Sequence, residues 1–315
     1  MVDSRRCGSS NVAIAIIGAG ALGSVFAAAL VEAGNPVTLL GRRPSPDITV
    51  CEPPCNLQKT LLHVETNPAS VANAEYVLML VKAYDTELAT QGIAPHLRPD
   101  ATVVTLQNGL GNAARIRANL PDGQQVLAGV TSQAARRVSS GLILHTGVGP
   151  TVIGYESDSE RARANCIAEA LSKAGLPSAV TGRIEPFIWQ KIAINAAING
   201  PTAIAGVPNG TLAERASLLE AATSLADEAA TVAAAHGYEL EGIHRTLRGT
   251  IEATAENRSS MLQDVDAGRR TEADAIYGSL IAAGRARGLA LPALTVVDAL
   301  VRSVSGHDGD REESR

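Results

Sequence analysis

Aromatic residues are scarce in this 315-residue chain, and long apolar runs are missing from it. Aromatics make up 3% of the sequence and apolar residues 45%, so Ala, Leu, Val and Ile must fill the core. No segment reaches the 18 or more apolar residues that a membrane span needs. The polar N-terminus also lacks the apolar core of a signal peptide. We therefore expect a globular cytoplasmic protein without a membrane partner.

The chain also has no excess of positive charge and few cysteines and histidines. Its formal net charge of -5 argues against nucleic acid as a partner. Cys51 and Cys55 stand in CEPPC, a spacing that matches no common zinc motif, and the six histidines form no HxxxH or HxH pair. We expect no metal site, and reduced thiols in a reducing compartment.

The first half of the sequence alternates short apolar runs with helical stretches. Runs rich in Val, Ile and Leu suit strands buried on both faces of a parallel sheet, and they occupy 12–17, 37–40, 76–81 and 103–106. Shorter strands are predicted over 126–128, 141–146, 151–153 and 178–180. A helix is predicted over Leu22–Ala33 and ends at Gly34. This alternation predicts a Rossmann-type, doubly wound α/β domain over residues 1–182.

From about Arg183 the sequence changes to Ala/Leu/Ile stretches with a helical period. The predicted helical stretches cover 213–236, 243–267, 272–287 and 294–304. A chain of this length exceeds one ordinary domain. We therefore predict a second, mostly α-helical domain over residues 183–315 that carries the substrate and catalytic residues, with a flexible acidic tail from about residue 306.

The segment GAGALG follows the first predicted strand and opens the first predicted helix. This context distinguishes a dinucleotide-binding fingerprint from a plain glycine turn. The glycines give a tight turn and a close backbone approach, and the helix N-terminus attracts the phosphates. The predicted cofactor-binding residues here are Gly18, Ala19, Gly20, Ala21, Leu22 and Gly23.

The end of the second strand indicates which dinucleotide binds. An NAD enzyme usually places Asp or Glu there to hold the ribose 2′-hydroxyl, but this chain has Arg42 and Arg43. A guanidinium can pair with a 2′-phosphate, so NADPH is favoured over NADH. The alternative is an exposed arginine pair without a ligand.

Further polar residues occupy positions where ligands bind in such folds. Lys82 and Asn108 each follow a buried strand, and the carboxyl ends of strands line the ligand crevice of an open α/β sheet. Lys191, Asn195 and Asn199 are spaced four residues apart and share one stripe of a largely apolar helix. Burying this stripe requires polar partners, which a ligand cleft or a salt bridge would supply.

Together these segments resemble the ketopantoate reductase (2-dehydropantoate 2-reductase) family. The resemblance runs from about Val12 to Pro292, and it rests on GAGALG, the arginine after the second strand, VKAYDT, QNGLG, W-x-K-x3-N-x3-N and NRSSMLQDVDAGRRTEAD. It implies an NADPH-dependent oxidoreductase that reduces 2-dehydropantoate to (R)-pantoate in pantothenate biosynthesis.

The resemblance also implies roles for individual residues. Lys191 resembles the general acid, and Glu272 the carboxylate that holds the substrate hydroxyl and lies beside the cofactor. Lys82 and Asn108 resemble residues near the nicotinamide, and Asp85 receives no role. The residues that resemble substrate contacts are Asn195, Asn199, Asn209, Asn257, Ser260 and Asn108, while Arg258 competes for the substrate carboxylate.

The spacing of Ser260 and Glu272 makes a structural prediction. Twelve residues rise about 18 Å along a straight helix, which is too far for one small keto acid to touch both. Gly268 lies between them and is a plausible break point. We therefore predict that the helix ends or bends between Asp266 and Thr271.

Two competing functions and several properties stay open at this level. One alternative is a related NADP-dependent reductase of another small 2-keto or 3-hydroxy acid, which Lys191 on a buried helix does not exclude, and a non-catalytic NADPH-binding sensor is a second. Burial would lower the pKa of Lys191 whereas Glu272 would raise it. The sequence does not decide between these effects, nor whether the apolar helical domain forms a homodimer.

Overall fold

The computed structural model describes residues 11–51 and 60–306. The described chain divides into two compact units. The first comprises the residues up to Gln107 together with Gly111–Ile184, and the second comprises Asn108–Leu110 together with the residues from Glu185 onward. The N-terminal ten residues and the acidic tail from residue 307 lie outside the described residues.

The described part of the first unit is built on an eight-stranded, mostly parallel sheet. Its order is β12-β11-β8-β7-β6-β1-β2-β5, and only the β11–β8 pair is antiparallel. The strand bounds are Ile14–Ile17 (β1), Val37–Leu40 (β2), Val64–Glu65 (β5), Tyr76–Met79 (β6), Thr102–Thr105 (β7), Gln125–Thr131 (β8), Thr151–Gly154 (β11) and Ser178–Thr181 (β12).

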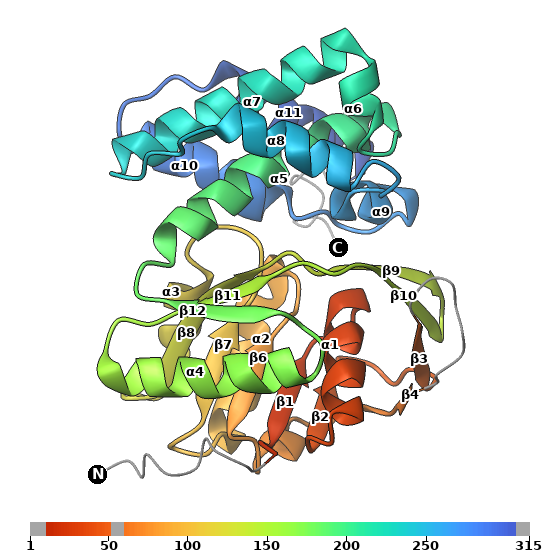
Figure 1. Ribbon diagram of the computed structural model, residues 1–315, viewed down its shortest axis with the longest axis vertical. Helices are drawn as coiled ribbons and strands as arrows, with labels where there is room; N and C mark the ends of the chain where they lie inside the picture. The colour runs from red at the N-terminus through yellow and green to blue at the C-terminus, as the bar shows by residue number, and fades with distance from the viewer. Residues whose placement is uncertain (1–10, 52–59, 307–315) are drawn as a thin grey trace, which may run out of the picture. The chain divides into compact units, whose positions relative to one another are not determined.

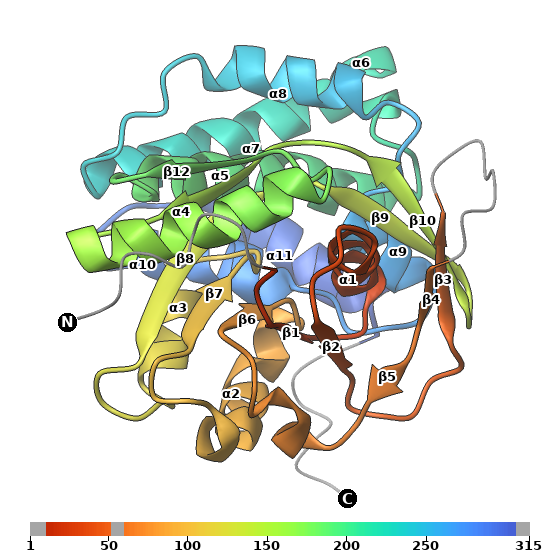
Figure 2. The ribbon, with the colours of Figure 1, turned by 60° about the horizontal axis from the view of Figure 1, so that its bottom comes forward.

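Helices cover both faces of this sheet because alternate side chains of its central strand point to opposite sides. Ile14 and Ile16 pack with helices α1 (Ala21–Glu32) and α4 (Asp158–Lys173). Ala15 and Ile17 pack instead with α2 (Thr86–Ile93) and α3 (Asn112–Arg117) (Figure 2). Three short 3₁₀ turns, η1 to η3, cover Pro68–Val71, Ala83–Asp85 and Ala94–His96. The predicted fold class is confirmed.

A second, four-stranded sheet in this unit was not anticipated from the sequence. Its order is β4-β3-β10-β9, with bounds Thr60–Leu62, Ile48–Cys51, Leu142–Gly147 and Ala134–Ser139. Of these strands only β10 was expected. The β9 sequence AARRVS has a half-exposed burial pattern, so it lacks the continuous apolar run that marks a strand buried on both faces.

The second unit is helical throughout its described residues apart from connecting loops. Helix α5 contacts α7, α8, α9 and α11, and its side chains contribute much of the unit's core (Figure 1). The bounds are Glu185–Ala205 (α5), Thr211–Glu214 (α6), Ala216–Ala235 (α7), Ile243–Ala253 (α8), Ser260–Asp266 (α9), Asp274–Gly278 (the π-helical turn η4), Ser279–Arg285 (α10) and Pro292–Val304 (α11).

The expectation of one continuous helical stretch over 243–267 is wrong. The chain leaves the helix at Thr254 and re-enters it at Ser260, where the Ser259 side chain accepts a hydrogen bond from the backbone N–H of Leu262. Serine competes well for a free N–H at a helix start, so the residues NRSS begin a new helix. The stretch predicted over 272–287 likewise opens with a π-helical turn.

The cysteines differ from expectation at one position. Cys51 is disulfide-bonded, so the expected reduced thiol is wrong there, while Cys166 is free. Cys7 and Cys55 lie outside the described residues. A disulfide depends on the separation and direction of two side chains, which sequence spacing does not determine. Among the described residues, no helix is long and apolar enough to cross a membrane, and no three His, Cys, Asp or Glu side chains group as metal ligands.

Candidate active site

The loop after β1 has the backbone geometry of the dinucleotide fingerprint. Gly18 has a φ of +119°, and a Cβ there would lie 2.8 Å from the backbone of Leu80. A Cβ on Gly23 would lie 2.0 Å from the carbonyl oxygen of Gly18, so only glycine lets α1 pack on this turn. Gly20, by contrast, faces open space.

The N-terminus of α1 therefore opens on a space that a ligand can enter. Gly20 is the N-cap, no side chain caps the helix, and its first turn holds no acidic residue. Free N–H groups and the positive end of the helix dipole attract phosphate at such a position. The sequence missed one contact here: Arg137 of β9 donates to the carbonyl of Ala19 at 2.8 Å, because the strand that carries it was not expected.

Arg42 lies two residues after β2 and is exposed, as a residue that meets a cofactor phosphate must be. Its Nη1 lies 3.1 Å from Oδ1 of Asp85, a residue to which no role was assigned from the sequence. Asp85 closes the short turn η2 that follows β6. Lys82 caps the start of the same turn and is partly exposed.

A glutamine that the sequence did not single out holds this loop. The amide of Gln107 donates to the carbonyl of Val81 at 2.9 Å and to the hydroxyl of Thr86 at 2.7 Å. Gln107 follows β7, so it ties the loop after β6 to the loop after the neighbouring strand. The QNGLG motif was its only signal.

Asn108 belongs to the second unit, although it follows a strand of the first. The amide of Asn195 donates to Oδ1 of Asn108 at 3.1 Å. Gly109 has a φ of +96°, and a Cβ there would lie 2.4 Å from the carbonyl oxygen of Ala275. Glycine is thus required where this loop passes η4. The structure brings together two residues predicted for substrate binding.

Lys191 and Asn195 lie with Asn199 on one stripe of α5, as the spacing predicts. The three residues are buried or partly buried, between the buried apolar side chains of the same helix. The amine of Lys191 is withdrawn from solvent, and this burial lowers its pKa. The structure thus decides the question that the sequence left open, because desolvation disfavours the charged ammonium.

A tyrosine hydroxyl from outside helix α5 bonds to the backbone of that helix at two positions one turn apart. The hydroxyl of Tyr277 donates to the carbonyl of Ala196 at 2.6 Å and accepts from the N–H of Gly200 at 2.8 Å. A regular helix would join Gly200 directly to Ala196. A Cβ on Gly200 would lie 2.2 Å from the hydroxyl. Tyr277 therefore bridges two backbone groups of α5 on either side of Asn199.

The remaining predicted substrate residues gather around the start of α9. The N–H of Asn209 donates to the carbonyl of Asn257 at 3.0 Å, and its side-chain amide donates to Thr254 at 2.9 Å. Oδ1 of Asn209 is buried and has no hydrogen-bond partner among the residues that the structure describes. Ser260 is exposed at the first turn of α9, whereas its neighbour Ser259 is buried as the cap.

The predicted break before Glu272 is confirmed. Helix α9 ends at Asp266, and Gly268 adopts a φ of +61°. Glu272 is buried, with 7% of its surface exposed, just before η4. Arg258, the competing partner for a substrate carboxylate, donates to Asp266 through Nε at 2.9 Å.

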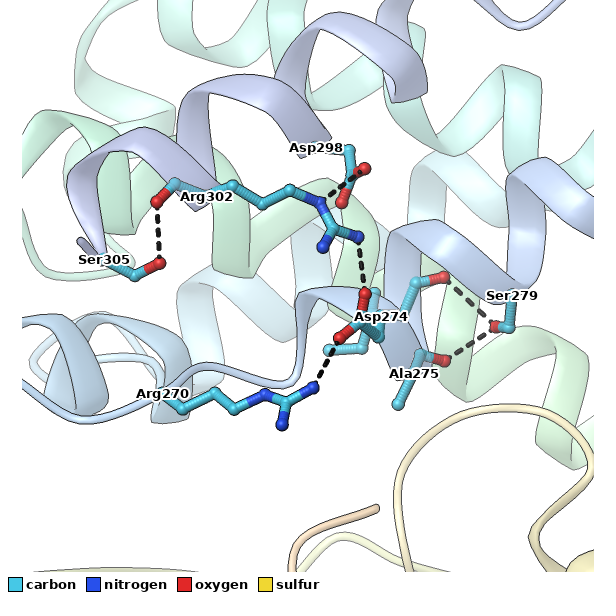
Figure 3. Close-up of polar contacts among 8 residues, drawn as sticks. Arg270, Asp274, Ala275, Ser279, Asp298, Arg302 and Ser305 are labelled. Carbon is cyan, nitrogen blue, oxygen red and sulfur yellow. Dashed lines mark hydrogen bonds and ion pairs between the residues drawn. The ribbon is translucent and has the colours of Figure 1, made fainter. Parts of the chain in front are cut away.

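Ion pairs anchor the turn that follows Glu272. Figure 3 shows Asp274 between Arg270 and Arg302, with Arg302 also reaching Asp298 of α11. The hydrogen bonds from Arg302 and Arg270 lower the pKa of Asp274 and outweigh the opposing effect of its burial. Since Tyr277 and Glu272 flank this carboxylate in sequence, the cluster holds in place the segment that carries both.

Comparison with known proteins decides the family. The model described as ketopantoate reductase PanE/ApbA matches residues 14–158, and the one described as ketopantoate reductase PanE/ApbA C terminal matches residues 183–305. The chain belongs to the ketopantoate reductase family. It is 34% identical over 300 residues to the 2-dehydropantoate 2-reductase of Halobacterium salinarum, with 92% of this chain and 97% of the relative covered. The 2-dehydropantoate 2-reductase of Archaeoglobus fulgidus is 36% identical over 293 residues, with the same coverage of 92% and 97%.

Solved structures show the same fold. The PanE/ApbA family ketopantoate reductase of Ralstonia eutropha superposes with a TM-score of 0.83 at 29% identity, over 93% of this chain and 98% of that one. D-mandelate dehydrogenase in its ternary structure with NADH and anilino(oxo)acetate gives 0.83 at 25%, over 93% and 98%. A ketopantoate reductase of Staphylococcus aureus that is described as dimeric gives 0.78 at 20%, over 94% and 99%.

Membership of the ketopantoate reductase family confirms the predicted resemblance and the predicted class of enzyme, an oxidoreductase. The described residues also fit the predicted dinucleotide cofactor, NADPH. The fit rests on the open space at Gly20, the uncapped N-terminus of α1 and the exposed guanidinium of Arg42. The non-catalytic sensor is not favoured.

Proposed function

We propose that this chain reduces 2-dehydropantoate to (R)-pantoate with NADPH, a step of pantothenate biosynthesis. The observation that carries this function is the polar stripe of α5, where a lysine amine with a lowered pKa lies one turn from the amide of Asn195 and two turns from that of Asn199. A sensor that only binds NADPH has no use for a buried proton donor. The close relatives that carry the name 2-dehydropantoate 2-reductase support the same conclusion.

The reaction adds a hydride and a proton across a ketone. NADPH supplies the hydride when bound. Lys191 gives its proton to the carbonyl oxygen as negative charge develops there, and its positive charge stabilises that oxygen beforehand. Burial helps this transfer because an amine with a lowered pKa releases its proton more readily. The neutral lysine then regains a proton from solvent before the next turnover.

The other predicted residues orient the two reactants. Asn195, Asn199, Asn209, Asn257 and Ser260 offer amide and hydroxyl groups to the substrate, and the unpartnered oxygen of Asn209 suits a substrate hydroxyl. Glu272 holds the substrate hydroxyl and lies beside the cofactor. Asn108, which already accepts a hydrogen bond from Asn195, contacts both the substrate and the nicotinamide.

The cofactor occupies the first domain, residues 1–182, through the GAGALG residues 18–23, Arg42 and Lys82. The helical domain, residues 183–315, supplies the proton donor and most of the substrate contacts. Arg42 selects the 2′-phosphate of NADPH, because a guanidinium pairs with a phosphate that a carboxylate would repel.

Oxidation of NADPH in the presence of 2-dehydropantoate tests this function. The loss of reduced nicotinamide absorbance is measured with 2-dehydropantoate. Under the same conditions it is measured with the 2-keto acid that corresponds to mandelate and with other, branched 2-keto acids. The reverse reaction is measured with hydroxyisobutyrate and glycerol 3-phosphate. We expect the highest kcat/KM for 2-dehydropantoate. A higher value for another substrate, or no oxidation at all, would refute the proposal.

We further propose that the enzyme forms a homodimer and acts in the cytoplasm. A related ketopantoate reductase is described as dimeric, and α11 exposes the apolar side chains of Val296, Leu300 and Val304 at four-residue intervals. Such a stripe suits a second copy of the same helix. Light scattering should give twice the monomer mass for the wild type and the monomer mass for Leu300→Glu. Cell fractionation tests the compartment.

A further inference from the structure

The ion pair between Arg42 and Asp85 lies at the carboxyl ends of the parallel strands, where the glycine-rich loop begins. Strand β1, which leads into that loop, has β2 on one side and β6 on the other. Arg42 comes two residues after β2, and Asp85 ends the turn after β6. Their 3.1 Å contact therefore spans the carboxyl end of β1, where a bound dinucleotide lies in this type of fold.

The carboxylate of Asp85 is not used to cap its own helix. Asp85 is the N-cap residue of α2, the position at which aspartate commonly accepts from the backbone. Its side chain makes no such hydrogen bond and reaches Arg42 instead. The side chain of Asp85 keeps 28% of its surface exposed and that of Arg42 keeps 66%, so both remain accessible to a ligand.

We propose that Asp85 sets the cofactor selectivity of this enzyme by competing with the 2′-phosphate of NADPH for Arg42. The inference rests on the proposed function, since it assumes that Arg42 receives this phosphate. To bind the phosphate, the guanidinium must leave the carboxylate or be shared with it, and a carboxylate so close repels the phosphate dianion. NADH carries a hydroxyl there, which can donate to Asp85. Asp85 thus weakens NADPH binding and leaves NADH binding intact.

The size of the effect follows from the exposure of the pair. An exposed ion pair changes an equilibrium by up to about fivefold, and the repulsion between Asp85 and the phosphate adds to this. We expect Asp85→Asn to tighten NADPH binding by about three- to tenfold. Added salt should reduce the gain, because exposed charges are screened.

The test uses the whole protein without substrate. Dissociation constants are measured by fluorescence or calorimetry for NADPH and NADH, and for the fragments 2′,5′-ADP and 5′-AMP, which differ only in the 2′-phosphate. Glu87→Gln is the matched control: it removes the same charge from the first turn of α2, where Glu87 contacts Gln91 rather than Arg42. Asp85→Asn is also made in an Arg42→Ala background.

The proposal is supported if Asp85→Asn tightens NADPH and 2′,5′-ADP while NADH, 5′-AMP and the Glu87→Gln protein stay within twofold. The gain should shrink when Arg42 is already alanine. Equal changes for all four ligands, or equal effects of the two carboxylate variants, would overturn the role of Asp85 and leave the proposed reduction intact. A wild-type protein that binds neither NADPH nor 2′,5′-ADP would overturn both.

Discussion

Replacing Tyr277 by phenylalanine tests whether one hydroxyl shapes the helix that carries the proposed proton donor. The change removes two hydrogen bonds, the one donated to Ala196 and the one accepted from Gly200. Both backbone groups lie in a buried part of α5. Burial also raises the pKa of Tyr277, so the hydroxyl stays protonated, and able to donate, at any pH of interest.

The expected loss of stability depends on what the backbone does next. If both groups stay unpaired, each costs about 1–3 kcal/mol. If the N–H of Gly200 instead donates directly to the carbonyl of Ala196, most of that cost disappears, and the accompanying shift of the backbone displaces Asn199. We expect a mixture of both effects: a free energy of unfolding lower by about 2 kcal/mol, and a KM for 2-dehydropantoate raised about tenfold, since a misplaced amide loses a hydrogen bond of about 1.4 kcal/mol.

Urea unfolding and steady-state kinetics measure these two quantities, and a fluorescence titration measures NADPH binding. Binding of NADPH should stay within twofold of wild type, because Tyr277 lies in the other unit from the glycine-rich loop. Tyr238→Phe is the control, since it removes a hydroxyl from the same helical unit but leaves the α5 ladder intact. A variant with the stability loss but an unchanged KM would show that Tyr277 does not position the stripe. Unchanged stability would show that the two hydrogen bonds of the Tyr277 hydroxyl do not stabilise the fold.

Three further predictions concern other parts of the second unit. Lys191→Ala should lower kcat about a hundredfold or more, and a variant within a few-fold of wild type contradicts this role. As the pH rises, wild-type activity should begin to fall before the usual pKa of lysine is reached. The reason is that burial lowers the pKa of Lys191, and the proton donor is lost as the pH rises through that pKa. Glu228→Gln should lower the free energy of unfolding by about 1 kcal/mol. The reason is that both carboxylate oxygens accept hydrogen bonds from backbone N–H groups at the start of α11, those of Ala293 and Leu294. Urea titration measures the change. The pKa of Asp274 is lowered, so its stabilising effect is present above about pH 4 and is lost as the pH falls below that value. The free energy of unfolding of Asp274→Asn should therefore decrease less on acidification than that of the wild type. An unchanged dependence on pH would contradict the role of the ion-pair cluster.

Much of this protein follows from its sequence alone. The apolar runs predicted strands whose bounds agree to within a few residues, and 37–40 agrees with β2. The GAGALG segment predicted a tight turn and an open helix start, and both are present at Gly18 and Gly20. The break near Gly268 was also predictable. These features are local, because they depend on backbone conformations that only glycine adopts readily and on periodicities that a short window contains.

The tertiary structure decided what depends on contacts between distant segments. The polar, half-exposed β9 gave no sequence signal, and so Arg137 was missed at the glycine-rich loop. Asp85 pairs with Arg42 because the fold brings together two loops that are 43 residues apart in the sequence. Tyr277 reached a helix 81 residues away. The sequence determined which residues of α5 form its polar stripe, but the direction of the Lys191 pKa shift depends on the burial of its amine, and burial is a property of the packed molecule.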